Sequence, residues 1–511
     1  MTTDAELPTP LGRILIVGGT LTAWIAAARL ASALRGTVRV TVVETPAPPA
    51  ERVTALSPAF RHDFFDRLGT PESTWMRACS ASFDAATKYT GWRPGPVYLP
   101  GPAAPPSCEG FPLTDFWHLR RRAGRTTEPV DHACFVTPPL LDARRSPRWF
   151  DGRAAFPYGW HADAVLLTRF LRRTAVQGCG VRLRTAAVLG ADRDGTGRIT
   201  ALQTTRGRER ADLFLDCTGP AALLLTGVLH EPFVPAAGHA PADRTVSVVL
   251  PHDTARLGIE PYATVTALPE GRLWRRPLPG RCAAALGYAS TRTSPEQAAR
   301  ALLDAVGRPG ADVTRTAAAP GRLRRSWVGN CLALGAAAGT ADPLAEDHAA
   351  TLDLLDRLLR DLPSRTSPDA PAARFNTAAA AHHEHALDLA RIRHFTSPAG
   401  RDDHSRLPAR LRSVLRAHST GLTPAPDELP LRALLTALTP HTAAPPPSLA
   451  HHPHAVRTAE DAFTRIKRHQ RTLLETLPPA HSYLSHLTAT PAPATLRPAR
   501  PTADAPGGPA S

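Results

Sequence analysis

Three glycine-bearing segments have the residue types and the order of a dinucleotide-binding site. In the first, residues 18–23 (GGTLTA) follow an apolar run and precede an Ala- and Leu-rich stretch. Such a turn directs backbone N–H groups and a helix N-terminus at a pyrophosphate. The next apolar run ends in Glu44, whose carboxylate would accept hydrogen bonds from an adenosine ribose. The pattern predicts phosphate contacts at Gly18, Gly19 and Ala23 and a ribose contact at Glu44.

Two later segments extend this prediction to a flavin. The string ADLFLDCTG reads as a strand that ends at Asp216 and Gly219. The string LALGAAAGTADP carries Gly335 and Asp342, at the positions where flavoproteins contact the ribityl chain. Three such segments in this order are more specific than one glycine turn, and they indicate FAD as the cofactor.

The turn itself departs from the GxGxxG pattern, because its three positions are Gly18, Thr20 and Ala23. The second glycine lets the backbone approach the phosphates, and Thr20 places a β-branched side chain there. The third allows close packing of helix on strand, for which Ala23 is a mild change. The alternative interpretation is therefore a flavoprotein-like fold whose cofactor binds poorly or not at all.

Hydrophobic periodicity supplies the elements that would position these residues. A strand, a helix and a second strand over residues 13–44 form a βαβ unit. Alternating strands over residues 240–290 predict a substrate-facing sheet. Further helices are expected at residues 58–90, 161–178 and 349–362, and over most of 370–487.

The predicted fold class is α/β, with a flavin-monooxygenase-like (Rossmann-type) FAD-binding core, a mixed substrate-side sheet and a helical C-terminal lobe. A chain of 511 residues with 43% hydrophobic composition can bury such a core. The expected divisions are a flexible N-terminus (1–12), the core (13–370), the helical lobe (371–488) and a disordered tail (489–511).

The composition bears on partners and compartment. The net charge of +15 comes almost entirely from arginines that are scattered along the chain, so a solvated surface is favoured over a nucleic-acid partner. Attraction of anions, such as halide, flavin phosphates or an acidic substrate, is a third interpretation. The N-terminus is polar and acidic, and no run of about 18 apolar residues occurs, so a cytoplasmic protein without a membrane span is expected.

Metal and disulfide chemistry are not predicted. The seven cysteines form no CxxC pair, and the runs HHEH and HHPH lack the i, i+4 spacing that aligns histidines on a helix.

Longer strings carry a family resemblance. WMRACSASFDAATKYTGWR, LDARRSPRWFDGRAAFPYGWHADAVLLTRFLRR, RHFTSPAGRDD and LPPAHSYLSHL resemble segments of the flavin-dependent tryptophan halogenases, and together they span about residues 12–488. The resemblance implies that a separate flavin reductase supplies reduced FAD, which with oxygen and halide ion yields hypohalous acid. It also implies a lysine that presents this species to the substrate, and Lys88 occupies the matching position.

The implied substrate is a small aromatic molecule, indole- or pyrrole-like, free or carried by another protein, within secondary metabolism. The oligomeric state is left open, with a homodimer as one option. The alternatives for Lys88 are a surface lysine of a helix and a lysine that has survived without its function.

The family's catalytic glutamate lies in a PLES string, which corresponds here to residues 343–347 (PLAED). In direct register its position is taken by Ala345, and Glu346 follows one residue later. Such a shift at the start of a helix turns a side chain by about 100°. Glu346 is thus either the catalytic acid, with a changed local backbone, or an exposed acid that favours the helix dipole. Asp347 and His348 replace the family's chloride-binding backbone.

The family's WxWxIP motif, which keeps substrate and flavin apart, corresponds to residues 272–277 (RLWRRP). Trp274 and Pro277 are retained, whereas Arg272 and Arg276 replace a tryptophan and an isoleucine. Two cations at these positions would change the wall between the two sites.

The predicted substrate contacts are Trp274, Phe111, Phe395 and Asp402. The loop that recognises tryptophan in the family is shortened to about residues 106–117, where Phe111 could fill space. Phe395 and Asp402 stand where the family grips the amino acid with a Tyr and a Glu. The altered motifs leave two rival functions open: a flavin monooxygenase, and a relative that does not halogenate, either a flavin-independent biosynthetic enzyme or a non-catalytic binding or scaffold protein.

Overall fold

The computed structural model describes most of the chain. The described residues are 9–45, 53–101, 106–236, 240–345, 348–364, 369–400, 407–422, 425–440 and 443–489. Glu346, Asp402, residues 1–8 of the predicted N-terminal segment (1–12) and residues 490–511 of the predicted tail (489–511) lie outside these ranges, so what was predicted for them stays a prediction.

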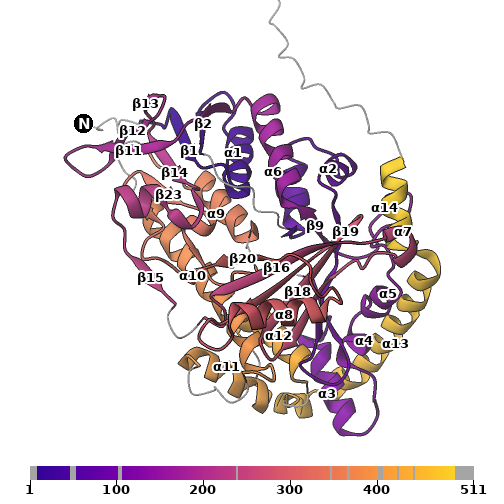
Figure 1. Cartoon of the computed structure of the whole chain (residues 1–511). Helices are drawn as coiled ribbons and strands as arrows, with labels where there is room; N and C mark the ends of the chain where they lie inside the picture. Colours follow the sequence, from indigo (N-terminus) through magenta and orange to yellow (C-terminus); the bar gives the residue numbers. More distant parts are fainter. Residues whose placement is uncertain are drawn as a thin grey trace, which may run out of the picture.

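A six-stranded sheet forms the predicted nucleotide-binding core (Figure 1), in the order β10-β2-β1-β14-β23-β22. All neighbours pair in parallel except β22 and β23. The strands are β1 (Arg13–Val17), β2 (Arg39–Glu44), β10 (Arg182–Thr185), β14 (Leu213–Asp216), β22 (Trp327–Val328) and β23 (Cys331–Ala333). Helix α1 (Leu21–Ala33) packs on this sheet and against α6 (Ala164–Arg173) and α9 (His348–Arg360). Because α1 is covered on several sides, the helix can be apolar all round and needs no polar face.

The second large sheet has seven strands, in the order β20-β16-β19-β18-β17-β5-β6. Strand β5 pairs in parallel with β17, whereas the other neighbours are antiparallel, which confirms the predicted mixed sheet. The strands are β5 (Ala86–Thr90), β6 (Val97–Pro100), β16 (Arg244–Pro251), β17 (Ala263–Leu268), β18 (Gly271–Leu278), β19 (Arg281–Tyr288) and β20 (Thr314–Ala317).

Helices dominate the last part of the chain, as predicted. They are α10 (Asp369–Phe395), α11 (Ala409–Thr420), α12 (Leu429–Leu438), α13 (Pro453–Thr476) and α14 (Ala480–Ala489). Helix α12 contacts β6 of the seven-stranded sheet, and α13 runs beside α3 (Leu113–Arg122), α4 (Val130–Cys134) and α5 (Pro138–Asp142) (Figure 1). The C-terminal helices therefore close one edge of the substrate-side sheet.

The helical prediction for residues 58–90 is only partly right. That stretch holds a short π-helix (Phe60–Phe65), helix α2 (Glu72–Ala78) and then two strands, β4 (Ser82–Asp84) and β5. Lys88 thus belongs to a strand, which excludes a surface lysine of a helix. The pairing of β5 with β6 and β17 overrides the local helical spacing, because β-structure depends on non-local neighbours.

The helix predicted over 161–178 also begins later than expected. Residues up to Asp163 complete strand β9 (Gly159–Asp163), and α6 begins at Ala164, where the Asp163 side chain accepts a hydrogen bond from the Leu166 N–H. No helix within the described ranges is long and apolar enough to cross a membrane. All seven cysteines are free, and the described residues contain no cluster of metal-ligating side chains.

Candidate active site

The glycine turn and the segment around Gly335 pack closely against neighbouring parts of the protein. Gly18 has φ of +125°, and a Cβ there would lie 2.3 Å from the Cys217 carbonyl oxygen. Gly335 has φ of +59°, and its Cβ would lie 2.6 Å from Thr22 Oγ1, in the first turn of α1. Both positions need glycine, because a side chain would meet strain and a close contact at once. The ends of β1, β14 and β23 therefore converge on the N-terminus of α1.

Thr20, at the second glycine position of the motif, is the N-cap of α1. Its hydroxyl donates to the Cys217 carbonyl at 3.0 Å and accepts from the Ala23 N–H at 3.3 Å. Ala23 is fully buried, so the close packing of helix on strand is kept. The residues present therefore fit a dinucleotide, since the changed residue turns its hydroxyl into the protein and the helix N-terminus is intact.

The two acids predicted at this end have different surroundings. The Glu44 carboxylate is partly exposed and pairs with Arg172, whose Nε lies 3.1 Å from Glu44 Oε1. Asp216 is fully buried, and its carboxylate accepts from the N–H groups of Thr218, Leu224 and Leu225. Asp216 thus organises the turn around Gly219, whereas Glu44 remains at the surface where a ribose would lie.

Asp342, predicted to lie near the flavin, forms a buried ion pair with Arg272. Arg272 Nη2 lies 2.9 Å from Asp342 Oδ2, and both residues are at most 4% exposed. Burial alone would raise the pKa of Asp342, but the charges of Arg272 and Arg393 outweigh it and hold the pKa below its usual value. The charge of Arg272, which stands where the family has a tryptophan, is therefore neutralised by Asp342.

Trp274 lies between two further guanidinium groups. The Arg276 group is 4.8 Å from the centre of its ring, and the Arg393 group is 5.8 Å away. Trp274 and Phe395 belong to the same buried apolar cluster. These contacts place two guanidinium groups near the Trp274 ring of strand β18. The sequence motif predicted a cation here from its residue types, but it did not predict these contacts.

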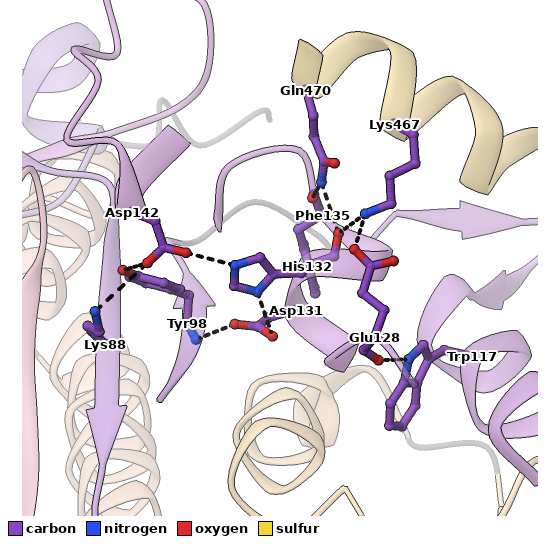
Figure 2. A network of polar contacts seen from close by, with 10 residues as sticks. All are labelled: Lys88, Tyr98, Trp117, Glu128, Asp131, His132, Phe135, Asp142, Lys467 and Gln470. Carbon is purple, nitrogen blue, oxygen red and sulfur yellow. Dashed lines mark hydrogen bonds and ion pairs between the residues drawn. The ribbon is translucent and has the colours of Figure 1, made fainter. Parts of the chain in front are cut away.

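Lys88 lies in a partly enclosed polar site (Figure 2). Its Nζ lies 5.0 Å from the centre of the Tyr98 ring, 5.5 Å from that of Tyr262 and 3.9 Å from Asp142 Oδ1. The Lys88 side chain is 22% exposed, so the amine is sheltered but reachable. Aromatic faces and a carboxylate are the groups that hold an ammonium ion in place.

The strand register separates Lys88 from Trp274. Lys88 lies opposite Thr264 of β17, which lies opposite Arg275 of β18, whereas Tyr89 aligns in the same way with Val265 and Trp274. Registered residues point to the same face of a sheet, and successive residues alternate. The Lys88 and Trp274 side chains therefore project from opposite faces.

A pocket opens between β6, α3, α4 and α12, beside Tyr98. It encloses about 590 Å³ of empty space, part of which is open to solvent. Burial raises the pKa of Asp115 to about 6, with the charge of Arg432 acting in the opposite direction. Arg432 is 9% exposed, and its Nη1 has no hydrogen-bond partner. Apolar walls with few charged groups are typical of a small-molecule site. The lining residues are Tyr98, Leu99, Pro112, Thr114, Asp115, Val130, Asp131, Phe135, Leu429, Arg432, Ala433, Thr436 and Ala437.

Phe111 packs in a different apolar cluster from Trp274 and Phe395, the other predicted substrate contacts that the structure describes. Its ring packs against Phe116 and His452, in the apolar cluster that links α3 to α13. Sequence reasoning missed Asp115, Arg432 and Asp142, because no local motif marks them. Asp142 lies within a quoted family string, LDARRSPRW, but nothing in that string indicates contact with a lysine.

The fold and the two sites define the class of protein: a flavoprotein-like α/β enzyme fold with a lysine at a separate, substrate-side sheet. The family model described as tryptophan halogenase matches residues 13–406. The chain is 32% identical to tryptophan 7-halogenase RebH of Lentzea aerocolonigenes and 34% identical to tryptophan 7-halogenase KtzQ of Kutzneria sp.. Each alignment covers 93% of this chain and 98% of the relative. The chain belongs to the tryptophan halogenase family.

Solved structures of tryptophan halogenases have a similar fold. A tryptophan 6-halogenase (SttH) from Streptomyces toxytricini superposes with a TM-score of 0.86 at 29% identity, covering 94% of this chain and 100% of that one. Tar14, a tryptophan C-6 flavin-dependent halogenase from taromycin biosynthesis, superposes with a TM-score of 0.85 at 29% identity and the same coverage. The predicted family and the predicted fold class are both confirmed.

Proposed function

We propose that this protein is a flavin-dependent halogenase that acts on a small aromatic substrate, with Lys88 as the residue that presents the halogenating species. The observation that carries the proposal is the Lys88 amine, held at the substrate-side sheet by two aromatic rings and a carboxylate. The relatives named as tryptophan 6- and 7-halogenases, and the one named as a chlorinase, support this chemistry.

The residues that would bind the cofactor and the lysine that would present the electrophile lie in two separate parts of the fold. Gly18, Gly19 and the N-terminus of α1 would bind the pyrophosphate, and Glu44 the ribose. Bound in reduced form, FAD would supply the electrons with which oxygen and halide yield hypohalous acid. A separate flavin reductase would deliver the reduced cofactor, as the family assignment supports.

At the other end, Lys88 would orient the electrophile by donating hydrogen bonds from its amine. The pocket beside Tyr98 is our candidate for the aromatic substrate, because its walls are mostly apolar and its charged groups are three: Asp115, Asp131 and Arg432. Glu346 is outside the described residues, and its role as the catalytic acid stays a prediction.

The test is Lys88→Ala, assayed with a flavin reductase, FAD, chloride and an aromatic substrate such as tryptophan. We expect loss of chlorinated product by a factor of roughly 100 or more, since a positioned acid–base group contributes at least this much. FAD affinity, measured by the absorbance change on titration, should equal that of the parent protein. Chlorination at the parent rate would contradict the proposal.

A further inference from the structure

The chain contains only two lysines, Lys88 and Lys467, against 58 arginines. Both belong to one polar network (Figure 2). Lys88 Nζ lies 3.9 Å from Asp142 Oδ1, and Lys467 Nζ donates to the His132 carbonyl oxygen at 2.9 Å. Between these two cations, Asp142, His132 and Asp131 form a continuous row of charged groups.

Both oxygens of Asp142 are held. Oδ1, the oxygen near Lys88, accepts from the Tyr98 hydroxyl at 2.7 Å, and Oδ2 lies 2.9 Å from His132 Nε2. Burial, followed by the hydrogen bond to Asp142, raises the pKa of Tyr98, so its hydroxyl stays a donor. The Asp142 side chain is 48% exposed, yet these two partners fix the plane of its carboxylate toward the amine.

His132 is placed between two carboxylates. Its Nε2 faces Asp142, and its Nδ1 lies 3.2 Å from Oδ1 of Asp131, which is 1% exposed. Asp131 is in turn fixed, because its Oδ2 accepts from the Tyr98 N–H at 2.7 Å. Burial lowers the pKa of His132, but its contacts with Asp131 and Asp142 outweigh burial, and the net shift is upward. An imidazolium would hydrogen-bond to Asp142 through Nε2 and attract Asp131 as an ion pair, since the Nδ1–Oδ1 contact has ion-pair distance but not hydrogen-bond geometry.

Helix α13 fixes the backbone of this row. Gln470 Nε2 donates to the carbonyl oxygens of His132 and Phe135, each at 2.9 Å. Lys467 is balanced by an ion pair with Glu128, so it adds no uncompensated charge near His132. The C-terminal helices thereby set the position of His132, and through it the position of Asp142.

We propose that Asp142 and His132 are positioning residues for Lys88: Asp142 binds the amine directly, and His132, held by Asp131, keeps the Asp142 carboxylate turned toward it. The inference rests on the proposed function of Lys88. It identifies an acid beside that amine in a chain where Ala345 occupies the register of the family's catalytic glutamate. It also makes the site dependent on pH, since loss of the His132 proton would leave a bare ring nitrogen facing the Asp131 carboxylate.

The two lysines allow a direct measurement. The full-length protein would be labelled with lysine carrying ¹³C at the ε carbon, which gives two side-chain NMR signals, assigned with Lys467→Arg. In Asp142→Asn, the chemical shift of the Lys88 ε carbon should move away from the parent value, because the carboxylate that faces the amine has lost its charge. His132→Gln should give a smaller change in the same direction, and Asp142→Glu should restore the parent chemical shift.

The matched control is Asp192→Asn, which removes an acid that pairs with Arg208 on a distant hairpin. Its Lys88 signal should equal that of the parent protein. An unchanged Lys88 chemical shift in both Asp142→Asn and His132→Gln would overturn the proposal. Using two variants keeps the test decisive if one of them fails to fold.

Activity separates this inference from the proposed function. We expect Asp142→Asn to lower kcat by roughly tenfold with little change in KM, and His132→Gln to remove the alkaline limb of the pH–kcat profile. If Lys88→Ala retained chlorination, the proposed function would fail while the NMR chemical shifts still tested the contacts. A parent-like kcat and pH profile in both variants would refute the positioning role even with Lys88 intact.

Discussion

The nucleotide-binding turn and the strand β18 have both lost residues of their motifs, but with different physical consequences. At the turn, Thr20 replaces a glycine, and its hydroxyl caps α1 and bonds to the Cys217 carbonyl. At β18, Arg272 and Arg276 replace apolar residues beside Trp274, and a buried ion pair with Asp342 compensates the first of them. The neutral change is thus accommodated by two hydrogen bonds of the Thr20 hydroxyl, whereas the charge of Arg272 is balanced by a second residue, Asp342.

This difference indicates where the molecule has kept its function and where it has altered it. The glycines that cannot be replaced, Gly18 and Gly335, are still present at the nucleotide end. In β18, arginines stand at two positions that are apolar in the family motif, and Asp342 balances the charge of one of them, Arg272. We therefore expect cofactor binding to be retained and the properties of the wall to differ from those of the tryptophan-containing motif.

The largest effect should follow Gly18→Ala. The new Cβ would lie 2.3 Å from a backbone oxygen at a φ of +125°, so neither the side chain nor its neighbour can move away. We expect a loss of unfolding free energy on the order of 4 kcal/mol and loss of FAD binding, measured by chemical denaturation and FAD titration. The control is Gly36→Ala, where φ is +83° but no atom lies within 4 Å, which should cost about 1 kcal/mol. Equal costs in the two variants would contradict the role of close contact.

The next effect concerns the β18 wall. Arg272→Met leaves the Asp342 charge buried without its partner, which should lower the unfolding free energy by about 3 kcal/mol. The double variant Arg272→Met, Asp342→Asn removes both charges and should recover most of that loss. A double variant as unstable as the single one would show that the ion pair is not what balances the arginine.

A pH effect should arise from Asp115 in the substrate-side pocket. Its pKa is about 6 in the folded protein against an ordinary value of 3.8, so folding disfavours the charged form. The contribution of Asp115 to the unfolding free energy therefore falls as the pH rises from about 4 to about 6 and is constant above that range. Asp115→Asn should therefore be more stable than the parent near neutral pH, by on the order of 2 kcal/mol, and equally stable near pH 4. Denaturation curves at both pH values would show this, and a uniform difference would contradict it.

The smallest effect should come from Thr20. Thr20→Gly restores the motif glycine and should change the unfolding free energy by only a few tenths of a kcal/mol, whereas Thr20→Ala should cost about 1 kcal/mol. FAD affinity should stay the same or rise in Thr20→Gly. A large loss of FAD affinity in that variant would mean that the hydroxyl itself contributes to binding.

The sequence predicted the fold where local patterns dominate. Residues 13–44 form the βαβ unit as expected, because buried parallel strands and a capped helix leave a continuous pattern in the sequence. The sequence pattern wrongly predicted a helix around Lys88. The strand β5 forms there because it pairs with β17, whose residues lie far along the chain.

The candidate site was predicted in part for the same reason. Gly18, Glu44 and Lys88 were predicted as site residues from motifs and from the family resemblance, and these roles stay predictions. The partnership of Asp142 with Lys88, and that of Asp115 with Arg432, arises when helices distant in sequence pack on one sheet edge. The spacing of residues along the sequence does not reveal such contacts.

The most direct test of the account is the mass of the product formed from an aromatic substrate with reduced FAD, oxygen and bromide. The account predicts that one hydrogen is replaced by bromine, recognisable by its isotope pattern, despite the arginines that replace apolar residues in β18. Addition of an oxygen atom without bromine would identify a monooxygenase instead, and would contradict the conclusion that Lys88 presents a halogenating species.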